Sequence, residues 1–223
     1  MTPDNTVPDA REAIESIVAN QPSLVVRTYS RIRFVILRQQ FLEEIGQYFP
    51  RRGKVLDLGC GFGLFSLFYA KTKRDLTLVG VDLDSKRIAM ATECGQRLGL
   101  TNVSYVADNA LSWVGKEQFD AIYMLDLVHH LPREEVPVFL RKVHDLLRPG
   151  ARLILKDVSN QPVFKRLFTL SLDRIMVGLF EPIHYWSPRE LIAVLESVGF
   201  EVKRHTMNDI LPYPHIVYVC QRS

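Results

Sequence analysis

The stretch Val55-Leu56-Asp57-Leu58-Gly59-Cys60-Gly61-Phe62-Gly63 decides the fold. A short, mostly apolar run leads directly into three glycines at alternate positions, and residues 62–71 then have helical character. The apolar run is typical of a buried strand, and glycine lets the chain turn sharply and approach a ligand closely. In α/β sheets ligands bind beyond the carboxyl ends of the strands, so this turn is placed to bind a nucleotide-like ligand.

The chain beyond this stretch alternates short apolar runs with helical patterns. Strands are expected at 54–58, 76–81, 103–107, 119–125, 152–156, 200–205 and 216–220. Helices are expected between them at 62–71, 85–98, 134–147 and 189–198, the last with Ser187 as its N-cap before Pro188. This alternation predicts an α/β fold, a doubly wound and mostly parallel sheet with helices on both faces.

Composition sets the broad class of protein. The chain has 223 residues, a formal net charge of +3 and 47% hydrophobic residues, as expected of a globular protein without a basic nucleic-acid-binding surface. Its three cysteines, Cys60, Cys94 and Cys220, fit neither a disulfide framework nor a zinc site, so a cytoplasmic location is expected. No apolar run reaches the roughly 18 residues of a membrane-spanning helix.

Two features favour S-adenosylmethionine over a dinucleotide at the glycine turn. The dinucleotide pattern requires a small residue at position 64, where this chain has Leu64. Asp57 places a negative charge beside the turn, which opposes a pyrophosphate but suits the ammonium or sulfonium group of S-adenosylmethionine. Asp82 ends the next strand, where a carboxylate accepts the hydroxyl protons of a ribose.

Five segments in order resemble the class I (seven-strand, Rossmann-like) S-adenosylmethionine-dependent methyltransferases: residues 55–63, 81–82, 107–110, 119–131 and 146–153. The resemblance implies a seven-stranded sheet whose last strand is antiparallel. It also implies S-adenosyl-L-methionine as the cofactor and S-adenosyl-L-homocysteine as the product. The cofactor-binding residues expected from it are Asp57, Gly59, Gly61, Gly63, Asp82, Leu83, Asp108, Asn109 and Leu125.

The acceptor side of the reaction is less visible in the sequence. A general base is needed only if the acceptor is a poorly acidic hydroxyl, amine or carbon acid. The candidates are His129 and His130 after the fourth strand, and His184 and Tyr185 further along the chain. Structural roles for these residues stay open as alternatives, and no metal site is expected.

Three segments outside the strand–helix alternation complete the predicted organisation. Residues 1–21 are expected to form a mobile N-terminal tail or a short loose helix, and residues 22–223 a single domain. Within it, residues 22–50 form an N-terminal cap helix and residues 160–186 an insertion that acts as a lid. Apolar residues at helical spacing in 161–182 indicate an acceptor pocket, a peripheral membrane contact or ordinary core packing.

The sequence therefore predicts methyl transfer to a small, apolar or lipid-like acceptor, with nucleic acid an unlikely partner. An RNA or protein methyltransferase is an alternative, although no Asn-Pro-Pro-aromatic tetrapeptide follows the fourth strand. A non-catalytic cofactor-binding module and an NAD-dependent oxidoreductase are the others. The methylated atom and the oligomeric state stay open.

Overall fold

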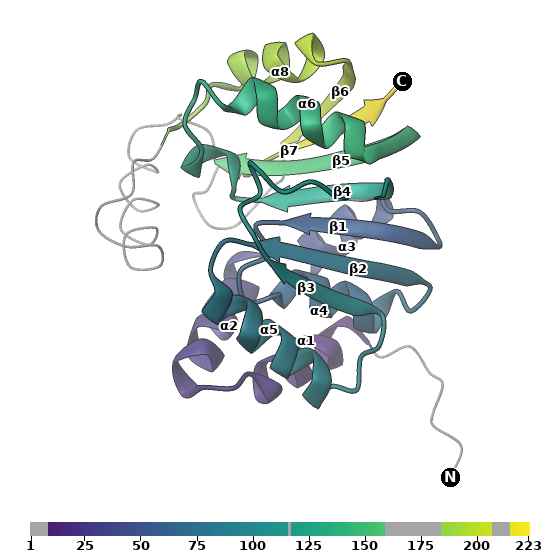
Figure 1. Ribbon diagram of the computed structural model, residues 1–223. Coiled ribbons are helices and arrows are strands. Elements are labelled where there is room, and N and C mark those ends of the chain that lie inside the picture. Colours follow the sequence, from purple (N-terminus) through teal and green to yellow (C-terminus); the bar gives the residue numbers. More distant parts are fainter. Residues whose placement is uncertain (1–8, 116, 159–183, 207–214) are drawn as a thin grey trace. The chain divides into compact units, whose positions relative to one another are not determined.

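The computed structural model describes residues 9–115, 117–158, 184–206 and 215–223. Within these residues the sheet has seven strands in the order β3-β2-β1-β4-β5-β7-β6 (Figure 1). The strands are β1 (Gly53–Leu58), β2 (Leu76–Asp82), β3 (Val103–Ala107), β4 (Phe119–Leu125), β5 (Leu147–Val158), β6 (Phe200–Thr206) and β7 (His215–Arg222). The predicted α/β fold, with a mostly parallel seven-stranded sheet whose last strand is antiparallel, is confirmed.

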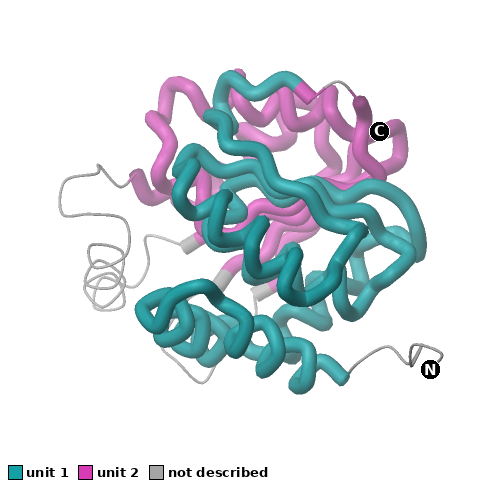
Figure 2. The backbone as a smooth tube through the Cα atoms, turned by 60° about the horizontal axis from the view of Figure 1, so that its bottom comes forward, with its two compact units in different colours: residues 1–114 teal, residues 115–223 magenta. Residues whose placement is uncertain are grey.

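The chain divides into two compact units, residues 1–114 and 115–223 (Figure 2). In unit 1, β2 pairs in parallel with β1 and with β3. Helices α4 (Leu64–Thr72) and α5 (Ser85–Arg97) pack against β2 and β3. Every residue from Leu64 to Ala70 is buried, which explains why this helix reads as a continuous apolar run and not as an amphipathic one.

The N-terminal residues correct two predictions. Residues 10–20 form α1 (Ala10–Asn20), which packs on α4 and buries Ala13 and Ile17 completely, so the alternative of a helix is right and the mobile tail is wrong for these residues. This i, i+4 pair is the apolar stripe of the helix, a short one between polar residues. Residues 1–8 lie outside the described part of the chain.

The single cap helix expected at 22–50 is two helices, α2 (Leu24–Ile36) and α3 (Gln39–Gln47). The chain leaves helical geometry at Leu37, where φ is −98° and ψ is 87°. Leu37 is completely buried, so packing outweighs the helical propensity of the segment at this point.

In unit 2, β5 pairs in parallel with β4 and antiparallel with β7, which in turn pairs antiparallel with β6. Helix α6 (Val136–Leu146) packs on β5, and α8 (Pro188–Ser197) packs on β6. The predicted N-cap is confirmed, because Ser187 and Glu190 form a reciprocal capping box at the start of α8.

Residues 159–183, which include nearly all of the predicted lid and the whole of 161–182, lie outside the described residues. Among the helices that are described, none is long and apolar enough to cross a membrane.

Candidate active site

The glycine turn joins β1 to α4. Gly59, Gly61 and Gly63 have φ values of 76°, 54° and 68°, in the left-handed region that favours glycine. A Cβ on Gly63 would lie 2.5 Å from the hydroxyl oxygen of Tyr105, whereas a Cβ on Gly61 would meet no atom within 4 Å. Gly63 is therefore required by packing, and Gly61 faces open space that a ligand can enter.

Asp82, at the end of β2, connects this turn to its neighbours. Its Oδ2 accepts a 2.8 Å hydrogen bond from the main-chain N–H of Gly61, and its Oδ1 accepts one of 3.0 Å from Asp84. The Asp82 carbonyl oxygen accepts a third bond, from the N–H of Asp108. A carboxylate has about four acceptor sites, so the two side-chain bonds leave capacity for both hydroxyls of a ribose.

Negative charge gathers at the turn. Asp57 is buried at the end of β1. Burial, and then the charges of Asp57 and Asp82, raise the pKa of the Cys60 thiol well above its usual value. Cys60 is thus a neutral packing residue, and the two carboxylates give the turn a potential that favours a cation over a pyrophosphate.

The remaining predicted cofactor residues of unit 1 follow β2 and β3. Leu83 is an apolar side chain that is 73% exposed. Asp108 and Asn109 are exposed at the end of β3, where Asp108 Oδ1 accepts a bond from the N–H of Asn109. An exposed apolar residue and an acid thus lie at the carboxyl ends of adjacent strands.

Helix α2 packs beside the turn within unit 1. The ring of Tyr29 lies 5.2 Å from that of Phe62, between centroids, and the guanidinium carbon of Arg87 lies 5.6 Å from the centre of the Phe62 ring. One helical turn further along α2, Arg33 lies over Phe65. Tyr29 is therefore held against a residue of the glycine turn itself, and Arg33 against one that follows the turn.

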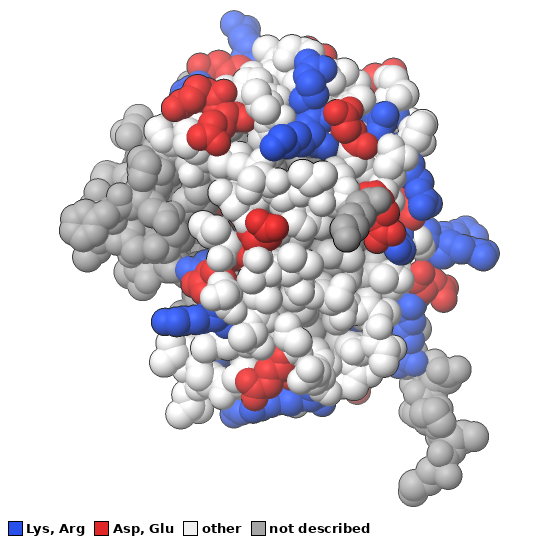
Figure 3. Space-filling view, viewed as in Figure 1, with Lys and Arg blue, Asp and Glu red and all other residues white. Residues whose placement is uncertain are grey.

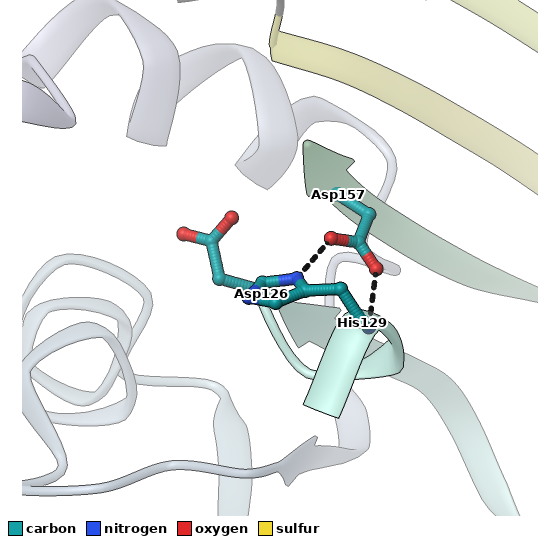
Figure 4. Close-up of side chains that lie close together, drawn as sticks. All are labelled: Asp126, His129 and Asp157. Atoms are coloured by element: carbon teal, nitrogen blue, oxygen red, sulfur yellow. Dashed lines mark hydrogen bonds and ion pairs between the residues drawn. The ribbon is translucent and has the colours of Figure 1, made fainter. Parts of the chain in front are cut away.

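In unit 2, His129 is anchored by Asp157. His129 lies in a 3₁₀ turn, η1 (Val128–His130), after β4, and Asp157 lies near the end of β5. The His129 main-chain N–H donates to Asp157 Oδ2 at 3.1 Å, and its ring Nδ1 is hydrogen bonded to Oδ1 (Figure 4). His129 is 1% exposed and Asp157 is 5% exposed. Two contacts to one buried carboxylate fix the orientation of the imidazole. The second ring nitrogen, Nε2, is the one that Asp157 does not contact.

An ion pair between the buried Lys156 and the half-buried Asp126 lies next to this pair. Lys156, only 1% exposed, donates from Nζ to Asp126 Oδ1. Asp126 has a left-handed φ of 61°, and its main-chain N–H donates to the Lys156 carbonyl oxygen at 2.9 Å. Oxygen and nitrogen atoms of Asp126, His129 and Asp157 lie within 4.8 Å of one another, close enough to share a metal ion. However, the Lys156 ammonium already supplies a positive charge to Asp126.

The other candidate bases lie around His129. The ring centroid of His130 is 4.1 Å from that of His129, and the Tyr185 ring stacks on His129 at 6.1 Å with a 12° interplanar angle. The N–H of His184 donates to the His129 carbonyl oxygen at 2.7 Å. Unit 2 therefore brings all four predicted residues together. Arg133 holds the adjoining segment, with its guanidinium 4.2 Å from the centre of the Trp186 ring and 3.0 Å from Glu190 Oε1.

A family model described as a methyltransferase domain matches residues 29–205, which are most of the chain. The chain belongs to the class I S-adenosylmethionine-dependent methyltransferases. Its cofactor is S-adenosyl-L-methionine, and the residues of the glycine turn fit that cofactor, with open space at Gly61 and unused acceptor capacity on Asp82.

Relatives of this methyltransferase act on different atoms. A ubiquinone biosynthesis O-methyltransferase of Ruegeria pomeroyi is 30% identical over 168 residues, which are 73% of this chain and 66% of that enzyme. Phosphoethanolamine N-methyltransferase 1 of Arabidopsis thaliana is 33% identical over 109 residues, 49% of this chain and 22% of that enzyme. The chain thus spans less than two thirds of the length of each.

A solved S-adenosylmethionine-dependent methyltransferase of Methanosarcina mazei has the same fold. The superposition has a TM-score of 0.64 with 21% sequence identity, and it covers 80% of this chain and 96% of that one. At this identity the likeness concerns the fold alone.

Sequence reasoning missed three residues that shape the site of this methyltransferase. Tyr105 lies against the glycine turn, and its hydroxyl is 3.1 Å from Ser66 Oγ. Lys156 and Asp157 follow the apolar run of the fifth strand. Two adjacent charged residues at the end of a buried strand require partners, and this pattern in the sequence could have indicated them. Leu125, predicted to contact the cofactor, ends β4 with its side chain buried.

Proposed function

We propose that this chain transfers the methyl group of S-adenosylmethionine to a hydroxyl oxygen of a small, apolar acceptor. The observation that carries this proposal is the buried His129–Asp157 pair at the carboxyl ends of β4 and β5. An imidazole whose Nδ1 is held by a carboxylate is the usual form of a general base in enzymes, because the carboxylate fixes the ring and stabilises the imidazolium.

The residues of unit 1 bind the cofactor in this proposal. Asp82 accepts the ribose hydroxyls, Gly61 leaves room for the ligand, and Leu83 with Asp108 and Asn109 contacts the adenine. The negative potential of Asp57 and Asp82 favours the cationic methionine portion. When bound, S-adenosylmethionine supplies a methyl group on a positively charged sulfur, which makes it an electrophile.

The residues of unit 2 handle the proton. His129 Nε2 accepts the proton of the acceptor hydroxyl, and Asp157 stabilises the resulting imidazolium. Burial of His129 keeps water from competing for that nitrogen. His130, His184 and Tyr185 flank the ring and shape the acceptor site, and His130, whose ring is half-buried, is the second candidate for the base.

The acceptor is assigned to the apolar class for two reasons. The relative in Ruegeria pomeroyi is named for ubiquinone biosynthesis and for O-methylation. The apolar residues of 161–182, predicted to form part of a lid, also favour such an acceptor. A second candidate acceptor is phosphoethanolamine, because the relative in Arabidopsis thaliana is named for its N-methylation.

The test is a matched pair of acceptors incubated with methyl-labelled S-adenosylmethionine. An alkyl-substituted catechol and the corresponding alkyl-substituted aniline differ in the atom to be methylated, and phosphoethanolamine is the third acceptor. Label in the catechol, with little in the other two, supports the proposal. Label in phosphoethanolamine or in the aniline alone would show that the chain is an N-methyltransferase. No label in any of the three acceptors would exclude the proposed acceptor class.

The role of the base is tested with His129→Gln, His130→Gln and Asp157→Asn, with the exposed His205→Gln as control. Loss of a general base lowers kcat by about 10²–10⁴-fold with a small change in KM. In Asp157→Asn the acid limb of the pH–rate profile is expected to move to lower pH, because the imidazolium has lost its stabilising charge. A lowered melting temperature with unchanged kcat would show His129 to be structural.

A further inference from the structure

Helix α2 has an apolar face that points outward. Its residues Leu24, Val25, Ile32 and Val35 are 78%, 79%, 47% and 67% exposed. At 100° per residue these four fall in one sector of the helix together with Thr28 and Arg31. The buried residues Val26, Ser30 and Phe34 fall on the other side. The helix is therefore apolar on its exposed face as well as on its buried one.

The fold of unit 1 does not need this outward face. The contacts that hold α2 beside the glycine turn come from other positions, Tyr29 on Phe62 and Arg33 on Phe65. Single exposed apolar residues are normal on a protein surface, but several on one face of one helix mark an interaction surface. We call the set Leu24, Val25, Ile32 and Val35 the outward face of α2.

The charged residues within α2 have one sign. No Asp or Glu occurs between Ser16 and Leu42, whereas Arg27, Arg31, Arg33 and Arg38 all lie in that stretch. Arg31 is exposed within the outward face itself. The complementary partner therefore combines an apolar interior with a negatively charged surface.

Other occupants are less complementary. A second copy of the chain packed face to face would bring its own Arg31 into the same apolar interface, with no acid of either α2 to pair with it. Residues 159–183 of the same chain carry three basic residues, Lys165, Arg166 and Arg174, against two acidic ones, Asp173 and Glu181, so they too have the same sign. Nucleic acid would leave the apolar side chains unused, and on the face drawn in Figure 3 basic and acidic side chains are interspersed.

We propose that α2 lies on the surface of an anionic lipid bilayer. The apolar side chains of its outward face enter the boundary between headgroups and acyl chains, and Arg31 contacts lipid phosphates. This surface is separate from residues 161–182, for which a membrane contact stays a prediction. Lipid binding by α2 does not depend on which acceptor is methylated, although it would bring a lipid-like acceptor close to the glycine turn.

The experiment is co-sedimentation of the full chain with vesicles of phosphatidylcholine, with and without phosphatidylglycerol. We expect binding that requires phosphatidylglycerol and weakens with salt. The triple variant Val25→Ser/Ile32→Ser/Val35→Ser should bind at least tenfold more weakly. The matched control Val114→Ser/Val138→Ser replaces valines that are 78% and 62% exposed elsewhere and should bind like wild type. Arg31→Gln should weaken binding by about fivefold, the contribution of one basic residue near an anionic surface.

Each alternative occupant has its own outcome. Equal binding to both kinds of vesicle, no binding by wild type, or wild-type binding by the triple variant would overturn the proposal. A concentration-dependent dimer that the triple variant abolishes would assign the face to a second copy. A lowered melting temperature in the triple variant would assign it to another segment of the chain. Binding of S-adenosylhomocysteine, measured separately, should be the same in all variants, so failure of lipid binding is distinguishable from failure of the cofactor site.

Discussion

The main-chain N–H of Gly61 donates a 2.8 Å hydrogen bond to Oδ2 of Asp82, and this bond joins the turn after β1 to the end of β2. The other carboxylate oxygen accepts from Asp84, where α5 begins. One side chain thus shapes the glycine turn and orders the start of the next helix, and it keeps lone pairs for a ligand. Asp82 and the glycines therefore form one structural unit, although Gly61 and Asp82 are 21 positions apart in the chain.

Asp82→Ala should weaken the binding of S-adenosylhomocysteine by about 10²–10⁴-fold, because it removes two hydrogen bonds to a charged group that contribute roughly 1.5–3 kcal/mol each. Isothermal titration calorimetry measures this loss. The control is Asp84→Ala, which removes the N-cap of α5 and should cost about 1 kcal/mol of stability with affinity unchanged. Equal affinities in wild type and Asp82→Ala would exclude the proposed ribose contact.

Gly61→Ala and Gly99→Ala form a second matched pair. Both glycines have positive φ, 54° and 66°, and an added Cβ would meet no atom within 4 Å at either position. Both variants should therefore lose similar stability, about 1–2 kcal/mol from the left-handed conformation, as measured by urea unfolding. Only Gly61→Ala should also lose affinity for S-adenosylhomocysteine. If Gly99→Ala loses as much affinity, the open space at Gly61 is not the ligand site.

The fold could be predicted from the sequence because its signals are local. Buried strands appear as short apolar runs, and Gly99 and Ser187 mark the end and the start of helices by their own chemistry. The boundaries of β3 and β4 agree with the expected ranges, 103–107 and 119–125. By contrast, the sequence could not decide between a tail and a helix for α1, because its apolar stripe is short and its stability comes from packing on α4.

The site could be predicted only where residue type alone indicates a role. Glycines at a turn and an acid at a strand end do so. The partnership of His129 with Asp157 does not, because it depends on how β4 and β5 pair in the sheet. The outward face of α2 was also missed, because a helical apolar stripe predicts a buried face and cannot tell which face the rest of the fold covers.

Lys156→Met should be destabilising by about 1–3 kcal/mol, because it leaves the half-buried Asp126 carboxylate without the charge that compensates it. Chemical denaturation measures the loss. The double variant Lys156→Met/Asp126→Asn should recover most of the stability, since asparagine tolerates the left-handed φ of 61° at position 126 and carries no charge. A double variant as unstable as the single one would show that the ion pair is not the cause.

Chelation separates the ion pair from a metal site. The ammonium of Lys156 supplies the positive charge beside Asp126 that a metal ion would otherwise supply. EDTA should therefore leave both the melting temperature and the rate of methyl transfer unchanged. Added Mg²⁺ or Zn²⁺ should not raise either. Loss of activity in EDTA, restored by one of these ions, would assign the Asp126–His129–Asp157 cluster to a metal and would contradict the proposed role of His129 as a base.

The three thiols should be inert in the folded protein. Burial raises the pKa of Cys94 to about 11, and burial also raises those of Cys60 and Cys220. A raised pKa keeps the neutral thiol at pH 8, where only about one Cys94 in a thousand would be a thiolate, the form that reacts. Iodoacetamide should therefore modify none of the three until guanidinium unfolds the chain. The rate of any slow reaction with iodoacetamide should rise about tenfold per pH unit between pH 7 and 9.

Cys60→Ala should methylate at the wild-type rate, because Cys60 only packs beside the turn. A large loss of kcat with unchanged affinity for S-adenosylhomocysteine would instead show that the Cys60 sulfur takes part in the reaction.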